Sequence, residues 1–253
     1  MSDNPLHDII AETMELVKQS AHPKTGMLTV SPEVAELYEQ IVAQVAPGMS
    51  DPVASAEASG GNAASPDLVS LAAEVSACKK CGLCEGRTQT VFSDGSPNAD
   101  LVFVGEAPGE NEDKQGIPFC GRSGDLLTDI IVKGMKMRRE DVYICNVIKC
   151  RPPNNRDPLS AEKDACEPYL IRQLELVQPK VICALGGHAA KTLLKTDEST
   201  GRLRGKWHFY HGIPLRVTYH PAYLLRSPGK KKKTWEDIQE VMKVMSGELT
   251  PTP

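Results

Sequence analysis

The sequence predicts an α/β fold with three layers, in which helices cover both faces of a central, mostly parallel four-stranded sheet. Four compact apolar runs support this prediction, and they lie at 100–105, 142–147, 180–186 and 214–220. Segments with apolar residues at helical spacing separate them. Runs that are apolar throughout are typical of strands buried on both faces, and their alternation with helices indicates parallel connections.

Helices are expected between and after these strands, at 123–136, 160–177, 187–195 and 234–246, and LVSLAAEVSAC predicts one that leads into a group of cysteines. In open parallel sheets, ligands bind beyond the carboxyl ends of the strands. The four strands run into GEAPGENED, NVIKCRPPNNR, GGHAAK and HPAYLLR, which are rich in polar residues, glycine and proline. The functional site is therefore expected at this edge of the sheet.

Ahead of the α/β domain, residues 1–46 predict a helical extension and residues 47–65 a flexible linker. The extension contains PLHDIIAETMELVKQS, with helical spacing, and SPEVAELYEQIVAQV, which opens with a serine N-cap and a proline at N1. The linker is rich in small residues, proline and glycine and has no periodicity. The α/β domain is expected to span residues 66–247, followed by a short tail at 248–253.

Composition argues against a membrane protein and against a globally basic one. The formal net charge is −4 at pH 7, so a nucleic-acid surface would have to be a local patch. No apolar run approaches a membrane span, and the N-terminus MSDNPLHDII lacks the features of a signal peptide. The chain is therefore expected in the cytoplasm, where eight cysteines favour bound metal over disulfides. Cys145 and Cys183 lie inside strand runs and are expected to be core residues.

Three cysteines lie close together in CKKCGLC, at residues 78–84. A C-x-x-C pair is typical of half a metal site or of a redox pair. Cys150, in a proline-stiffened loop, and Cys166, on the following helix, could converge on this turn. Four thiolates favour zinc or an iron–sulfur cluster, and the spacing alone leaves that choice open. It also leaves Cys84 as a competitor to Cys78 or Cys81.

Five stretches resemble the family 4 uracil-DNA glycosylases, the iron–sulfur members of the uracil-DNA glycosylase superfamily. They occur in the family's order across residues 75–245 and read CKKCGLCEGRTQTVFSDGSPNADLVFVGEAPGENED, GIPFCGRSGDLL, VYICNVIKCRPPNNRDP, CEPYL and HPAYLLRSP. The resemblance implies an enzyme that flips uracil out of DNA and hydrolyses its N-glycosidic bond, leaving an abasic site. No matching motif places a lysine as a Schiff-base nucleophile, so a monofunctional glycosylase is expected.

The same resemblance implies a structural [4Fe–4S] cluster. Its ligands, carried over onto this sequence, are Cys78, Cys81, Cys150 and Cys166, which makes Cys84 a bystander. The implied partner is uracil-containing DNA, and we expect a monomer. The N-terminal extension lies outside the resemblance and could dock on a repair or replication protein, or on the domain itself.

The resemblance also assigns roles to residues at the strand ends. His220 is placed to donate a hydrogen bond to uracil O2 as negative charge develops there, which a neutral imidazole can do. Asn146 offers one amide donor and one acceptor, which match uracil O4 and N3–H and mismatch cytosine. Phe119 is expected to stack on the flipped base. In the best-known branch of the superfamily a water-activating aspartate and a thymine-rejecting tyrosine stand where this chain has Ala107 and Gly109.

Without that aspartate, the group that activates water is left open. Glu112 is expected to brace the loop, against Asn154 or Asn155, and to shape the pocket against the methyl group of thymine. A plain surface cluster is the alternative interpretation for the acidic residues here, above all for Glu110. The candidates for catalysis and uracil binding on this loop are Glu106, the backbone groups of Ala107 and Pro108, and the pair Glu112 and Asp113.

The segment directly after His220 is expected to contact DNA. An apolar wedge that enters the base stack, followed by an arginine near phosphate, fits the residues there, although a helical turn that packs inward is the alternative. Ser123 is expected to contact a phosphate at a helix N-terminus. The four lysines at 230–233 either form a solvated face or add attraction to phosphate. The DNA-contacting candidates after His220 are Tyr223, Leu224, Leu225 and Arg226.

Three other interpretations compete with a glycosylase. A non-catalytic iron–sulfur or zinc module could bind uracil or abasic DNA without turnover, but the set of Phe119, Asn146 and His220 argues against it. The superfamily branch that traps its product covalently carries an inserted basic loop with a reactive histidine where this chain has KCRPPNNRDP. A thiol redox enzyme would need a strand-to-helix context that CKKCGLC lacks.

Overall fold

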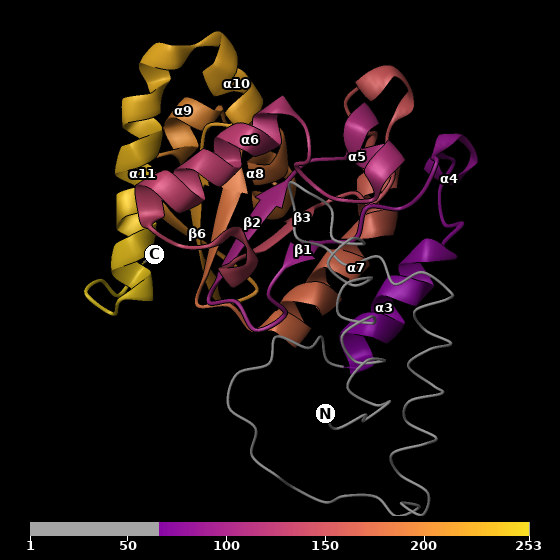
Figure 1. The fold of residues 1–253 in the computed structure, drawn as a ribbon, viewed down its shortest axis with the longest axis horizontal. Coiled ribbons are helices and arrows are strands. Elements are labelled where there is room, and N and C mark those ends of the chain that lie inside the picture. Colours follow the sequence, from indigo (N-terminus) through magenta and orange to yellow (C-terminus); the bar gives the residue numbers. More distant parts are fainter. Residues whose placement is uncertain (1–65, 253) are drawn as a thin grey trace, which may run out of the picture. The chain divides into compact units, whose positions relative to one another are not determined.

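The computed structural model describes residues 66–252, so the predicted extension (1–46) and linker (47–65) lie outside the described residues. The described part is an α/β fold around a sheet with the strand order β1-β3-β2-β4-β6-β5 (Figure 1). The four predicted strands form its parallel centre, which confirms the predicted fold class. They are β2 (Leu101–Gly105), β3 (Tyr143–Asn146), β4 (Val181–Leu185) and β6 (Ile213–Thr218).

The sheet has six strands rather than the predicted four, because an antiparallel strand is added at each edge. β1 (Asp94–Gly95) pairs with β3, and β5 (Trp207–Tyr210) pairs with β6. His211 and Gly212, which join β5 to β6, both have positive φ (47° and 80°), as the tight turns of hairpins require. β1 is too short, and β5 too exposed, to give the apolar signal of a buried strand.

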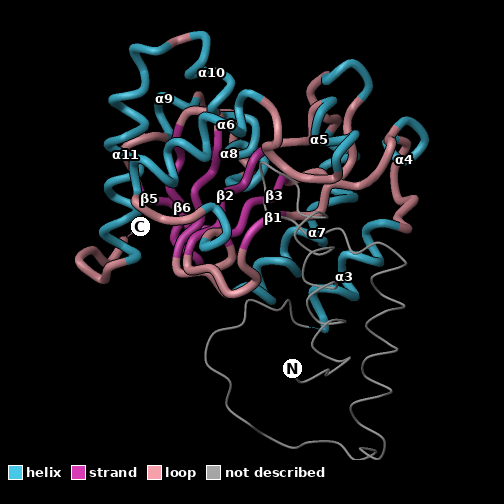
Figure 2. Tube along the Cα trace, in the orientation of Figure 1, coloured by secondary structure: helices cyan, strands magenta, loops and turns pink. Residues whose placement is uncertain are grey.

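Helices cover both faces of the sheet, as predicted (Figure 2). Alternate strand residues face the two layers: Val102 and Val104 join the core on one face, and Leu101 and Phe103 join the core on the other. The first face is covered by α3 (Pro66–Ser76), α7 (Ser160–Val177) and α8 (Gly187–Leu194), and the second by α6 (Arg122–Asp129) and α11 (Lys231–Met245).

Two predicted helices differ from the structure in detail. The helix expected at 123–136 is α6 followed by a π-helical segment, Ile130–Met135. Within that segment Gly134 packs against α11, where an added Cβ would lie 2.9 Å from the Trp235 ring. The last helix, α11, begins at Lys231 rather than near residue 234, so most of the lysine run forms its first turn.

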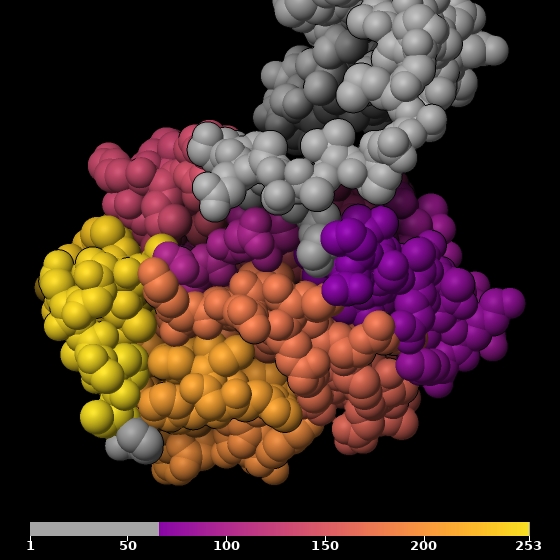
Figure 3. Space-filling view, turned by 90° about the horizontal axis from the view of Figure 1, so that it is seen from below, coloured from indigo at the N-terminus to yellow at the C-terminus, as the bar shows by residue number. Residues whose placement is uncertain are grey.

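Shorter helices and 3₁₀ turns form the remaining connections. They are α4 (Leu83–Gly86), α5 (Glu110–Gln115), α9 (Thr200–Leu203) and α10 (Pro221–Arg226), with 3₁₀ turns at Arg139–Asp141, Pro153–Asn155 and Pro228–Lys230. α11 and α3 lie at opposite ends of the described domain (Figure 3). Among residues 66–252, no helix combines the length and the apolar character needed to cross a membrane.

Candidate active site

The carboxyl ends of the parallel strands bring the predicted base-contacting residues together. Gly105 ends β2 and lies opposite Asn146, which ends β3. A Cβ added to Gly105 would lie 2.3 Å from Asn146 Oδ1 and 2.7 Å from the Phe119 ring. Only glycine leaves room here, so the close approach of the amide and the aromatic ring depends on the first glycine of GEAPG.

Phe119 is held in an unusual backbone conformation beside the histidine. Its φ of 52° lies in the left-handed region, which is costly for an aromatic residue and is often found at functional sites. The side chain is buried, and its ring centroid lies 5.6 Å from that of His220, with an interplanar angle of 31°. The neighbouring turn needs Gly124, where a Cβ would collide with the Phe119 carbonyl oxygen. The two rings therefore form adjacent walls of one site.

His220 is fixed in one neutral tautomer. Its Nδ1 accepts a hydrogen bond from the Ala222 backbone N–H (3.1 Å), as the N-cap of α10, which leaves Nε2 as the protonated nitrogen. Burial, together with the nearby charges of Arg226 and His188, lowers the pKa of His220 to about 4. Gly186, with φ 91°, lets the β4 end approach the His220 side chain closely. The imidazole is thus a neutral donor near pH 7.

Asn146 is supported by a lysine that the sequence analysis did not single out. Lys149 is only 1% exposed, and its ammonium donates a hydrogen bond to the Asn146 backbone oxygen (2.6 Å). Its backbone N–H donates to Cys166 Sγ (3.4 Å). Lys149 therefore touches both the end of β3 and a predicted cluster ligand. The available signal was a charged residue inside the apolar run NVIKC.

Glu106 and a neighbouring histidine form a second polar group at the strand ends. His188 Nδ1, at the start of α8, lies 3.3 Å from Glu106 Oε1 and 3.7 Å from Asp157 Oδ2. Burial raises the pKa of Glu106, Asp157 adds to the rise, and His188 opposes it. The side-chain ligand atoms of these three residues lie within 4.8 Å of one another. Neither His188 nor Asp157 was predicted.

Glu112 braces the GEAPG loop, but through a different contact from the one predicted. Its Oε2 accepts a hydrogen bond from the Gly109 backbone N–H (3.1 Å) in a capping arrangement at the start of α5. Asn155, a predicted partner, instead accepts a hydrogen bond from Arg151 Nε (2.8 Å). The brace is therefore local to the loop, where Pro108 is buried and Ala107 packs against the core.

The other two acidic residues of the loop have different environments. Asp113 is buried and accepts hydrogen bonds from the Thr88 backbone N–H at 3.0 and 3.1 Å, so the surface interpretation is wrong for it. Glu110 is exposed and pairs with Lys114 (2.6 Å), as the surface interpretation expects. Asp113 thus ties the segment after the cysteine turn to α5.

α10 and α6 pack against each other, which puts Ser123 and the segment after His220 on the same side of the domain. Leu224 is 1% exposed, which favours the alternative of an inward-packing turn for this residue. Leu225 is 40% exposed, Arg226 is exposed and Tyr223 is partly buried. α10 therefore presents Leu225 and Arg226 to solvent, while its apolar face, with Leu224, packs inward.

Five thiols line a pocket next to the segment that follows β3. The predicted ligands converge there as expected, and Cys84, the predicted bystander, lies in the same pocket. Cys145 and Cys183 are fully buried in strands, as predicted. The pocket draws on the turn after α3, on α4, on the loop after β3 and on α7, with the thiols of Cys78, Cys81, Cys84, Cys150 and Cys166.

Donors surround the sulfur atoms of this pocket. Arg87 Nη1 lies 3.1 Å from Cys150 Sγ, and the Lys80 backbone N–H lies 3.5 Å from Cys78 Sγ. Burial raises the pKa of the Cys150 thiol to about 11, and the hydrogen bond and charge of Arg87 oppose the rise. The soft donor set fits zinc or an iron–sulfur cluster.

Comparisons with known proteins point to one superfamily. The model of the uracil DNA glycosylase superfamily matches residues 92–239. The type-4 uracil-DNA glycosylase of Sulfurisphaera tokodaii is 44% identical over 194 residues, which cover 74% of this chain and 86% of the relative. Those of Saccharolobus solfataricus (45% over 184 residues; 70% and 85%) and Thermotoga maritima (42% over 181 residues; 69% and 93%) are similarly close. This chain belongs to the type-4 uracil-DNA glycosylases.

Proposed function

We propose that this protein is a monofunctional uracil-DNA glycosylase, which hydrolyses the bond between uracil and deoxyribose and leaves an abasic site. The observation that carries the proposal is that Phe119 lies with Asn146 beside Gly105 and also against the neutral His220. Three side chains that can stack on, read and polarise a pyrimidine thus come from three different segments. A flipped base is the ligand that needs all three.

Recognition of uracil rests on Phe119 and Asn146. The phenyl ring offers a stacking surface for the extruded base. The amide of Asn146 donates to uracil O4 and accepts from N3–H, whereas cytosine presents the opposite pattern at these positions. Because the amide is 2% exposed, a mismatched base would leave its polar atoms unsatisfied, at about 1–3 kcal/mol per group.

His220 stabilises the leaving group. As the bond between C1′ and N1 breaks, its electron pair passes to the uracil ring and negative charge develops on O2. The Nε2–H of His220 donates a hydrogen bond to that oxygen without transferring its proton. The hydrogen bond from Ala222 fixes the ring in advance, so little reorganisation is needed in the transition state.

Glu106 is the residue that we assign to the attacking water. Its carboxylate stands at the end of β2, next to the Asn146 strand end, and it is the partly buried acid of the loop without a backbone hydrogen bond to hold it. It accepts a proton from water as the oxygen attacks C1′. Glu112 has a different part, because its contact with Gly109 holds the loop in shape.

Cys78, Cys81, Cys150 and Cys166 would hold a [4Fe–4S] cluster. When bound, the cluster cross-links the turn after α3 to the loop after β3 and to α7. Arg87 and the backbone N–H of Lys149 would donate to its sulfur ligands. On the DNA side, Tyr223, Leu225, Arg226 and Ser123 contact the strand from which uracil is extruded.

The test is excision from a uracil-containing oligonucleotide, single- and double-stranded, with chelator present, read by alkaline cleavage. Oligonucleotides with thymine or cytosine at the same position are the controls. Cleavage of the uracil substrates alone is expected. Binding without cleavage would contradict the proposal and favour a non-catalytic module, and a covalent protein–DNA band would favour the trapping branch.

A further inference from the structure

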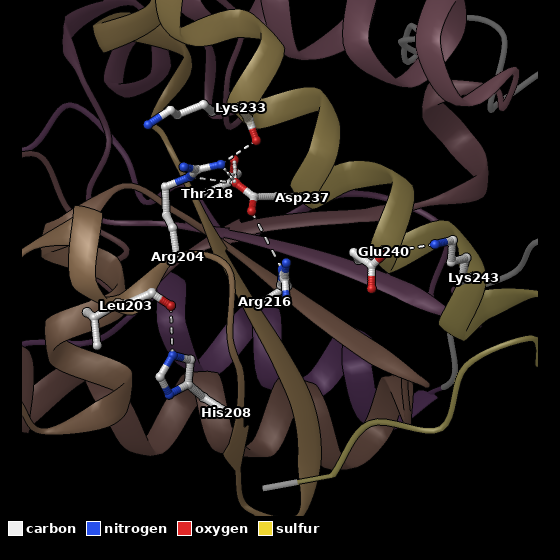
Figure 4. Close-up of polar contacts among 9 residues, drawn as sticks. All are labelled: Leu203, Arg204, His208, Arg216, Thr218, Lys233, Asp237, Glu240 and Lys243. Carbon is white, nitrogen blue, oxygen red and sulfur yellow. Dashed lines mark hydrogen bonds and ion pairs between the residues drawn. The ribbon is translucent and has the colours of Figure 1, made fainter.

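A buried carboxylate outside the base pocket joins the last helix to the strand that carries His220. Asp237, on α11, is 1% exposed. It accepts hydrogen bonds from Thr218 Oγ1 (2.8 Å) and from Arg204 Nε (2.7 Å), and Arg216 Nε lies 3.6 Å away (Figure 4). A carboxylate buried this deeply is tolerated only when it is paired and hydrogen-bonded, so these donors are required by it.

The same contacts hold the backbone that leads into His220. Thr218 is the last residue of β6, two positions before the histidine. Its side chain is bound to Asp237, and its backbone oxygen accepts from the Gly186 N–H (2.9 Å). Gly186 in turn lies against the His220 side chain, where an added Cβ would stand 2.9 Å from His220 Cβ. The end of β6 is therefore held by Asp237 through the Thr218 side chain and by Gly186 through the Thr218 backbone.

Arg204 also contacts the next residue, Tyr219. Its guanidinium carbon lies 4.6 Å from the centre of the Tyr219 ring, a cation–π contact. The Tyr219 ring lies 5.2 Å from that of Tyr223 on α10. Three consecutive residues, 218–220, are thus each fixed by a separate contact, and two of these contacts lead to Asp237.

We propose that Asp237, with Thr218 and Arg204, is a positioning network that sets the place of the His220 imidazole for the transition state of uracil excision. The network touches neither base nor DNA and acts through the β6–α10 turn. The inference rests on the proposed glycosylase function. These contacts lie outside the base pocket, yet they are expected to affect the rate of excision. A displacement of about 1 Å in a catalytic group can cost up to about 100-fold in rate.

The first test compares two threonine-to-valine variants. Thr218→Val removes the hydroxyl that binds Asp237 and keeps the side-chain shape. Thr234→Val is the matched control: Thr234 is also buried, lies on the same helix as Asp237, and its hydroxyl has no hydrogen-bond partner among the described residues. Single-turnover excision at saturating enzyme should fall about tenfold in Thr218→Val and stay near wild type in Thr234→Val. Equal rates in the two variants would overturn the proposal.

A double-mutant cycle separates positioning from a general loss of stability. If Thr218 acts through His220, Thr218→Val should have no further effect on the rate in a His220→Ala background. A full additional loss there would overturn the proposal. Thr218→Ser, which keeps the hydroxyl, should restore the rate, and failure to do so would also count against it.

Two further controls keep the result interpretable. Should Thr218→Val not fold, Tyr219→Leu tests the same network, because it removes the ring that Arg204 contacts. This variant should slow excision and leave DNA affinity unchanged. A wild-type rate would overturn the proposal. Absence of uracil excision in the wild-type protein would be a failure of the proposed function. Wild-type excision with an inert Thr218→Val would be a failure of the network alone.

Discussion

The base pocket, which is the proposed site around Phe119, Asn146 and His220, and the cysteine pocket both adjoin the end of β3 but are built in different ways. The base pocket stands on strand ends, where sheet register and close glycine contacts set Asn146 and His220 in place. The cysteine pocket is assembled from a turn, a loop and two helices that are far apart in the sequence. The first is therefore shaped by the folded core itself, whereas the second depends on contacts between separate segments, such as Arg87 with Cys150 and Lys149 with Cys166.

Lys149 is the point at which the two regions meet. Its ammonium binds the Asn146 backbone, and its N–H binds Cys166. A buried ammonium is costly unless its donors are used. Because Lys149 contacts both pockets, a change at this residue is expected to disturb both. Variants can change each region separately and then Lys149, which contacts both.

The largest effect is expected in the cysteine pocket. Cys150→Ser should lose the iron and the visible absorbance of the cluster and lower the midpoint of thermal unfolding by about 10 °C or more, because metal binding there contributes folding energy. Iron analysis and calorimetry measure both. Cys84→Ser is the matched control and should keep its iron. Unchanged iron in Cys150→Ser would contradict the ligand assignment.

The next largest effect is expected in the base pocket, on the rate of uracil excision rather than on DNA binding or iron content. His220→Ala should slow single-turnover excision by about 10²–10³-fold, as expected for the loss of one preorganised donor. Affinity for uracil-containing DNA and iron content should remain close to wild type. Near-normal turnover in this variant would show that the imidazole does not stabilise the leaving uracil.

A smaller effect is expected at the joint between the pockets. Lys149→Met keeps the length of the side chain but leaves the buried Asn146 oxygen without its donor, at about 1–3 kcal/mol. Uracil excision should fall about tenfold. Lys180→Met, at an exposed lysine paired with Asp100 (2.8 Å), is the control. Equal excision by the two variants would mean that Lys149 does not position the base reader.

The smallest effect concerns pH. The pKa of His220, about 4 in the folded protein, lies below its ordinary value of 6.5. The unfolded chain therefore takes up a proton at this residue first, and the stability that His220 contributes is complete above pH 6.5 and is lost as the pH falls toward 4. Titration of His220 should leave excision flat from pH 6 to 8. An NMR titration of the imidazole checks this, and a pKa near 6.5 would contradict it.

The sequence was sufficient for the parallel centre of the sheet because Leu101–Gly105 and its companions are apolar throughout. It was insufficient for β1 and β5, which are short or partly exposed and give no such signal. In the site, residues within matched motifs came together as expected, including Phe119, Asn146 and His220.

The residues that were missed depend on tertiary contacts. His188 sits in an ordinary helix start, and only the alignment of β4 beside β2 brings it to Glu106. Asp237 looks like a surface residue of an amphipathic helix until Thr218 and Arg204 are placed around it. The inward direction of Leu224 likewise depends on the packing of α10 on α6, which sequence spacing does not reveal.

The most direct test of the central claim is single-turnover excision of uracil by Asn146→Asp beside the wild type, with iron content measured in the same samples. The claim is that β3 ends in the group that reads the base, while the thiols only maintain the fold. A carboxylate at this position loses the donor to uracil O4, so excision should fall by about 100-fold or more with full iron retained. Wild-type excision by this variant would contradict the account.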